Sequence, residues 1–137
     1  MSDVRPLLLD SSFLVSYERD KTRRTQGFLL EAITDARILL VTGLSVTATA
    51  AELSGKCPEL NWLLNDSAGP IQVLPLSATN ALEVGALIGP PEKADLTTAE
   101  TAQIVYESGA IRAVVLTHEP DRYNGHPIHV VDMRRSH

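Results

Sequence analysis

Short apolar runs, separated by longer amphipathic segments, set the pattern of this chain. Leu7–Leu9 is continuously apolar, as expected of a strand buried on both faces of a sheet. Four further β-rich runs predict strands at 37–41, 71–75, 113–117 and 127–131. The pattern therefore predicts a sheet of four to five strands.

Between these runs, apolar residues recur with the 3.6-residue period of helices. A short helix after Asp10 is expected to place Phe13, Leu14 and Tyr17 on one face. Further helices are expected at 27–35, from Ser45 or Thr47 to 53, at 59–65, at 77–88, and from Asp95 to Gly109. The last of these is expected to turn four apolar residues inward: Ala99, Ala102, Val105 and Tyr106. Strands separated by helices imply an α/β fold with a mainly parallel sheet.

Length and composition indicate one domain. The chain has 137 residues without a repeat, linker or low-complexity tract, so residues 1–137 are expected to form a single unit. Hydrophobic residues make up 44% and charged residues 21%, as in ordinary soluble proteins. The one cysteine, Cys57, allows no internal disulfide. No apolar run has the length of a membrane span, and we expect a cytoplasmic protein that does not enter a membrane.

The net charge of −5 argues against a domain that binds nucleic acid through bulk positive charge. It leaves open a nucleic-acid enzyme with a locally acidic site. The positions of the acidic residues therefore matter more than their excess.

Four acids fall near the carboxyl ends of predicted strands, where parallel α/β sheets place their sites. Asp10 directly follows the first strand, and Glu119 closely follows the fourth. Asp95 opens the helix that leads to the fourth strand, and Glu52 lies on the helix after the second. Carboxylates gathered at one edge need a compensating charge. Mg²⁺ or Mn²⁺ would supply it, and could activate water for attack on a phosphodiester.

Four strings carry these acids. They are LLLDSSFLVSYE at Leu7–Glu18, TAAEL at Thr49–Leu53, DLTTAETAQIVYESG at Asp95–Gly109 and VVLTHEPDRY at Val114–Tyr123. These strings resemble the PIN domain family, the metal-dependent ribonuclease fold of VapC-type toxins. The resemblance covers nearly the whole chain, is specific at the first and last strings, and is weak at 19–46 and 55–87.

The resemblance implies a three-layer α/β/α fold, usually dimeric. It implies that four acids hold Mg²⁺ or Mn²⁺: Asp10, Glu52, Asp95 and Glu119. Ser11 and Thr117 match hydroxyl positions that orient the acids or a metal-bound water. The implied activity is endoribonuclease cleavage of RNA by metal-activated water, with RNA as substrate, an antitoxin protein as a possible partner, and a homodimer as the assembly.

Each acid also has a structural interpretation. Asp10 and Asp95 suit helix caps, and Glu52 suits a solvated helix face. Glu119 could be a turn residue, and it is one methylene longer than the Asp that the family usually has, so Asp121 could take its place. The main alternative is therefore a PIN-fold protein without catalysis, used for binding or regulation. A different small α/β domain, whose acids only cap helices, is also open.

Two further features have open interpretations. The charged run ERDKTRR at 18–24 is either a solvated turn or a contact for RNA phosphates. Trp62, next to Leu60, Leu63 and Leu64, either joins the core or forms an apolar patch for a dimer or an antitoxin helix.

Overall fold

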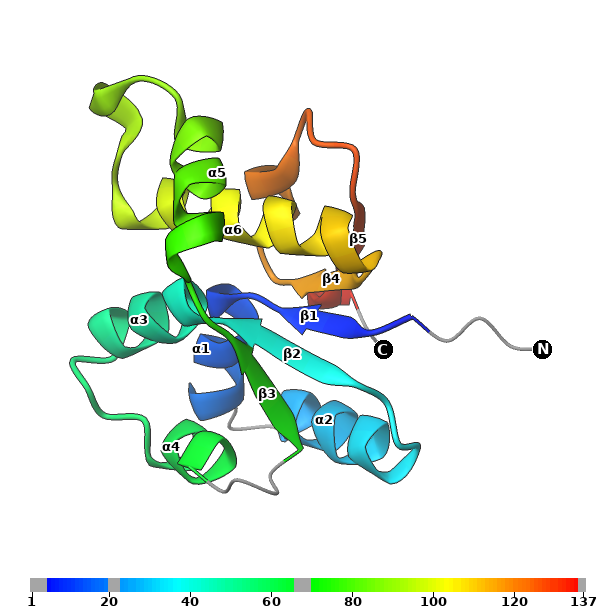
Figure 1. Cartoon of the computed structure of the whole chain (residues 1–137). Coiled ribbons are helices and arrows are strands. Elements are labelled where there is room, and N and C mark those ends of the chain that lie inside the picture. Colours follow the sequence, from blue (N-terminus) through cyan, green and yellow to red (C-terminus); the bar gives the residue numbers. More distant parts are fainter. Residues whose placement is uncertain (1–4, 20–22, 66–69, 136–137) are drawn as a thin grey trace.

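Five parallel strands form one sheet in the computed structural model, which describes residues 5–19, 23–65 and 70–135. The strands are β1 (Leu7–Leu9), β2 (Leu39–Thr42), β3 (Ile71–Leu74), β4 (Val114–Thr117) and β5 (His129–Asp132). Their order in the sheet is β3-β2-β1-β4-β5, and every neighbouring pair is parallel (Figure 1). The predicted α/β fold with a parallel sheet is confirmed.

Helices surround this sheet. The α-helices of the described residues are α1 (Ser11–Arg19), α2 (Arg24–Thr34), α3 (Gly43–Glu52), α4 (Pro58–Asn65), α5 (Ala78–Ile88) and α6 (Leu96–Ile111). Three 3₁₀ segments in the same residues are η1 (Pro91–Lys93), η2 (Pro120–Tyr123) and η3 (Met133–Arg135). In the charged run, Glu18 and Arg19 belong to α1 and Arg24 starts α2, while residues 20–22 lie outside the described residues. In the described ranges, none of the helices has both the length and the apolar character needed to cross a membrane.

The strands bury both of their faces, because successive side chains point to opposite sides of the sheet. Leu7 and Leu9 belong to one core, which includes residues of α1, α2 and α4. Leu8 belongs to a second core, with Ile104 of α6. Figure 1 shows α5 and α6 on one side of the sheet and α1, α2 and α4 on the other. The arrangement is three-layered, consistent with a PIN-like fold, and it explains why the first strand is apolar without alternation.

The register brings three polar residues to the carboxyl edge of the sheet. Leu9 of β1 pairs with Val41 on one side and with Leu116 on the other. The residues that follow these three are Asp10, Thr42 and Thr117, and all three are buried. Helices α1 and α3 begin at this edge, so their N-termini lie beside it (Figure 1).

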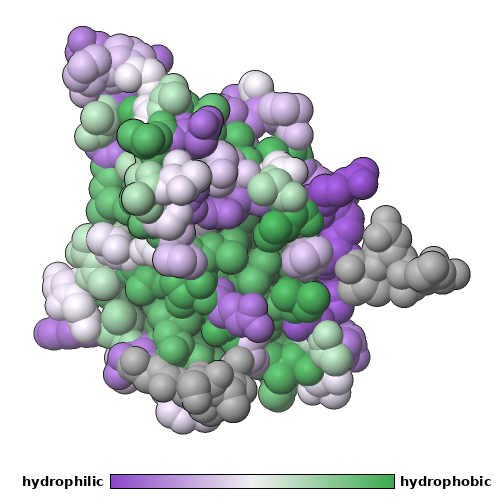
Figure 2. Space-filling model, viewed as in Figure 1, coloured by the Kyte–Doolittle hydropathy of each residue, from purple (hydrophilic) through white to green (hydrophobic). Residues whose placement is uncertain are grey.

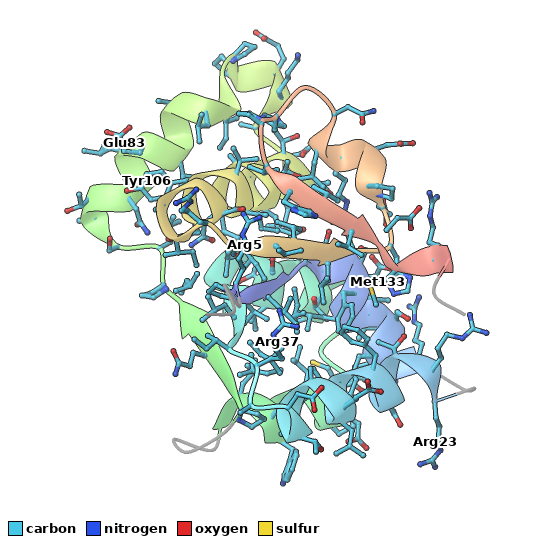
Figure 3. All side chains as sticks on the ribbon, turned by 90° about the vertical axis from the view of Figure 1, so that its right-hand side faces the viewer. Arg5, Arg23, Arg37, Glu83, Tyr106 and Met133 are labelled. Atoms are coloured by element: carbon cyan, nitrogen blue, oxygen red, sulfur yellow. The ribbon has the colours of Figure 1, made fainter. Side chains whose placement is uncertain are left out.

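At the opposite, amino edge of the sheet, arginine side chains donate hydrogen bonds to backbone carbonyls. The Nε of Arg5 donates to the carbonyl of Arg112 at 2.7 Å, and Nη2 of Arg37 donates to the carbonyl of Arg5 at 2.9 Å. Figure 3, which looks onto this side of the molecule, shows Arg5 and Arg37 near the middle of the view. These guanidinium groups tie loops to the strand starts, and the buried acids lie at the other edge.

Candidate functional site

Asp10 lies at the end of β1 with no exposed surface. Its Oδ1 accepts hydrogen bonds from Oγ of Ser12 at 2.6 Å and from the backbone N–H of Phe13 at 3.0 Å. Its Oδ2 accepts the phenolic O–H of Tyr123 at 2.7 Å. The side chain therefore caps α1 and at the same time belongs to a buried polar network.

Glu100, on α6, is a second buried carboxylate at this edge, only 1% exposed, and the sequence analysis did not identify it. Its Oε2 accepts from the backbone N–H of Ser11 and from Oγ of Ser45, both at 2.7 Å. Its Oε1 accepts from Oγ of Ser11 at 2.7 Å and from Nη1 of Arg122 at 3.2 Å. A carboxylate has about four acceptor positions, so donors of the protein occupy all those of Glu100.

Arg122, on η2, brings a positive charge between the acids, and its side chain is 14% exposed. Nη1 lies 3.2 Å from Oε1 of Glu100 and 3.9 Å from Oδ2 of Asp10. Nη2 lies 3.3 Å from Oε2 of Glu119. Burial works against this charge, but Glu100, Asp10 and Glu119 outweigh it and raise the pKa of Arg122. We call this group the Asp10–Glu100–Arg122 cluster.

The two predicted hydroxyl residues, Ser11 and Thr117, both reach the cluster. Ser11 binds Glu100 through its backbone N–H and its Oγ. Oγ1 of Thr117 lies 3.1 Å from Oγ of Ser12, which donates to Asp10, and it accepts the backbone N–H of Glu119 at 2.9 Å. Because the single hydrogen of Ser12 is used on Asp10, Thr117 donates to Ser12. Ser11 thus orients Glu100, and Thr117 orients Asp10 through Ser12.

The structure does not bring Glu52 to Asp10. Glu52 is the last residue of α3, its side chain is 55% exposed, and Oε2 lies 3.6 Å from Nη1 of Arg19. Arg19 ends α1, about 12 Å along the helix from Ser11 at 1.5 Å per residue. The residue of α3 that does reach the cluster is Ser45, in the first turn of the helix.

Asp95 and Glu119 have different positions again. Asp95 is the N-cap of α6, exposed, and its Oδ1 accepts the backbone N–H of Thr98 at 2.7 Å. This hydrogen bond lowers the pKa of Asp95. Glu119, with a side chain 58% exposed, contacts the cluster through Arg122. Of the four predicted acids, Asp10 lies in the cluster, Glu119 at its rim, and Glu52 and Asp95 elsewhere.

The residues of the cluster do not fit a metal centre of the expected kind. In the described part of the chain, no group of three or more acidic, histidine or cysteine side chains is placed to hold one metal ion. Two of the expected ligands, Glu52 and Asp95, make other contacts, and the guanidinium of Arg122 lies among the remaining carboxylates. The geometry is that of an internal ion-pair network at the strand ends.

Burial is the largest influence on the pKa values of two groups, Glu100 and Tyr123. It raises the pKa of Glu100, and the negative charge of Asp10 raises it further, while hydrogen bonds from Ser11 and Ser45 work in the opposite direction. Burial and the charge of Asp10 likewise raise the pKa of Tyr123. The N-termini of α1 and α3 favour negative charge at this edge. The negative charge of the buried carboxylates is therefore balanced by nearby hydrogen-bond donors and by Arg122.

The phenol of Tyr123 gives a first prediction. Tyr123→Phe removes the hydrogen bond to Asp10 and is expected to lower the free energy of unfolding by about 1–3 kcal/mol at neutral pH. The folded wild type keeps the phenolic proton above pH 10.0, the ordinary pKa of tyrosine, whereas the unfolded chain releases it. Wild type should therefore lose more stability than Tyr123→Phe as the pH rises above 10.0, as measured by urea unfolding. Equal losses in the two proteins would contradict this.

The periodicity of apolar residues along α6 does not indicate Glu100, because the buried face of the helix is partly polar. Of the four residues expected to face inward on α6, Ala102 is buried and the other three are half-buried. Besides Ala102, the buried residues of the helix are Ile104 and three polar residues: Glu100, Gln103 and Ser108. Gln103 accepts the N–H of Leu44 and donates to the carbonyl of Leu74, which explains its burial. The spacing of Glu100, Gln103 and Ser108 around Ile104 was the available signal.

On the surface of the protein, an apolar groove lies between α2 and α4 and has a volume of about 620 Å³. Its lining includes Tyr17, Leu29, Leu30, Ile33, Trp62 and Leu63. Trp62 is 68% exposed and Leu30 65% exposed, whereas Leu60 and Leu63 are buried. Within α4, Leu60 and Leu63 thus join the core and Trp62 lies on the surface. Figure 2 shows hydrophobic residues gathered also over the middle of the face along which β3 runs.

No family model matches this sequence, and no curated protein matches it. The relation to the PIN family therefore stays a proposal, based on the sequence strings and on the three-layer α/β/α fold.

Proposed function

We propose that this chain is a PIN-like protein that acts by binding a partner protein in the groove between α2 and α4. The observation that carries the proposal is the exposure of Trp62 and Leu30 on the lining of one apolar groove. Exposed apolar surface of this kind is typical of interaction sites, and tryptophan is among the residues that contribute most to binding energy. The groove is therefore the candidate interface.

The occupant that fits the groove best is an amphipathic helix of the partner. Helices α2 and α4 form the walls of the groove, and Tyr17 of α1 belongs to its lining. An amphipathic helix binds in an apolar groove of this kind through apolar side chains at positions i, i+3 and i+4. Arg37 and Glu59 add one charge of each sign to the lining, so the polar side of the helix can pair with both. An antitoxin, the partner that the resemblance implies, has this chemistry.

Trp62 itself reports on this binding, because it is the one tryptophan of the chain. The resemblance implies that an antitoxin would be encoded by a gene next to that of this chain. Addition of that purified protein should shift the Trp62 fluorescence to shorter wavelength as water leaves the indole. Calorimetry should show binding lost in Trp62→Ala and kept in Leu82→Ala, a control on α5 whose side chain is exposed. A concentration-dependent shift without the partner would assign the groove to a second copy of this chain, and unchanged affinity in Trp62→Ala would contradict the proposal.

Metal-dependent RNA cleavage is the second candidate function. It is favoured by two buried carboxylates, Asp10 and Glu100, at the carboxyl ends of parallel strands, since buried charges in such places mark functional sites. The test is cleavage of single-stranded RNA with Mg²⁺ or Mn²⁺, comparing wild type with Asp10→Asn and Glu100→Gln. The binding proposal expects the same absence of cleavage in all three proteins. Metal-dependent cleavage by wild type that both variants lose would favour the nuclease.

A further inference from the structure

Positive charges of the protein itself balance the two buried carboxylates of the Asp10–Glu100–Arg122 cluster. Two carboxylates are fully buried, and the guanidinium of Arg122 contacts both. The N-termini of α1 and α3 each contribute roughly half a positive charge at the same edge. These contributions together are of the size of the two negative charges. The exposed Glu119 has water as well as Arg122 to stabilise it.

The contacts also leave little coordination capacity. All four acceptor positions of Glu100 and three of those of Asp10 have donors from the protein. Two residues of the same short segment contribute to this arrangement, because Tyr123 binds Asp10 and the adjacent Arg122 binds Glu100. A cation that entered here would have to displace the guanidinium.

We propose that Arg122 is the permanent cation of this cluster and holds the place that a divalent metal ion would otherwise take. The wild-type cluster accordingly binds neither Mg²⁺ nor Mn²⁺. Removing the guanidinium leaves two buried carboxylates without their counter-ion, and these then recruit a hard divalent cation, for which carboxylate oxygens are the preferred ligands. The proposal concerns the cluster alone and is independent of the groove between α2 and α4.

The test titrates the purified full chain with MnCl₂ and follows free Mn²⁺ by its electron paramagnetic resonance signal. Arg122→Met is expected to bind Mn²⁺ at least about tenfold more tightly than wild type. Arg122→Lys, which keeps a positive charge, should show no such gain, and the double variant Arg122→Met/Asp10→Asn should lose it. An Arg122→Met protein that folds only after Mn²⁺ is added, as seen by circular dichroism, would support the proposal equally.

Two results would overturn it. One is Mn²⁺ binding by wild type that Asp10→Asn abolishes, and this arm does not depend on the folding of any Arg122 variant. The other is a folded Arg122→Met protein that binds Mn²⁺ no better than wild type. Neither result bears on partner binding at Trp62, so failure of this inference and failure of the proposed function are separable.

Discussion

Replacing Glu100 with alanine is expected to lower the free energy of unfolding by about 3–5 kcal/mol, because Arg122 then stays buried with one of its partners gone. The same change leaves the N–H of Ser11 and the hydroxyl of Ser45 without their acceptor. The matched control is Glu52→Ala, at an acid that the sequence predicted as a metal ligand. Glu52 is largely exposed and pairs with an exposed arginine, so its loss should cost less than about 1 kcal/mol.

Urea unfolding followed by circular dichroism, in the presence of a chelator, measures both variants. The ranking of the two variants is the informative result, since it separates an internal ion-pair network from a solvated helix face. Equal stability of Glu100→Ala and Glu52→Ala would mean that the buried contacts of Glu100 contribute nothing net to the fold.

Replacing Arg122 with methionine is the second change with a large expected effect. Methionine replaces the apolar stem of arginine but leaves Asp10 and Glu100 buried without a counter-ion, which should cost about 3–5 kcal/mol. Arg19→Met, in an ion pair whose two side chains are mostly exposed, should cost less than about 1 kcal/mol. Because Asp10 and Arg122 contact each other, Arg122→Met/Asp10→Asn should lose less stability than the two single changes added together.

Thermal and urea unfolding without metal give the comparison, with wild type, Arg122→Met, Arg19→Met, Asp10→Asn and Arg122→Met/Asp10→Asn measured side by side. A cost for Arg122→Met as small as that for Arg19→Met would contradict the role of Arg122 as the counter-ion.

The architecture was predictable because apolar runs and helical periods are local signals. The continuous run Leu7–Leu9 indicated a strand covered on both faces, and the structure places its residues in two separate cores. The five predicted strands are present, with β2 at Leu39–Thr42 in place of 37–41 and β5 at His129–Asp132 in place of 127–131. Asp10 was also predictable as a residue of the site, since it directly follows the central strand.

The composition of the cluster was less predictable, because its contacts join distant parts of the chain. Glu100 and Ser11 are separated by 89 positions, and Arg122 and Ser11 by 111. No local pattern indicates such pairs. An acid within a helix looks solvent-facing until the partner that it meets is known, and for Glu100 that partner is the start of α1.

The placement of Glu52 depended on where its helix begins. Since α3 starts at Gly43, directly after β2, Glu52 falls in its last turn and Ser45 in its first. The sequence around Asp95 allowed two interpretations, a helix cap and a metal ligand. In the structure Asp95 caps α6. Helix starts are set by capping geometry at the level of single residues, and a shift of a few residues decides which side chain reaches the strand ends.

The role of Arg122 as the permanent cation of the cluster is tested most directly in a crystal of the wild-type protein soaked in MnCl₂. The measurement is the anomalous scattering of manganese. We expect no anomalous peak beside Asp10 or Glu100, with Nη1 of Arg122 in contact with Oε1 of Glu100. A manganese peak bonded to both carboxylates, with the guanidinium of Arg122 displaced, would contradict it.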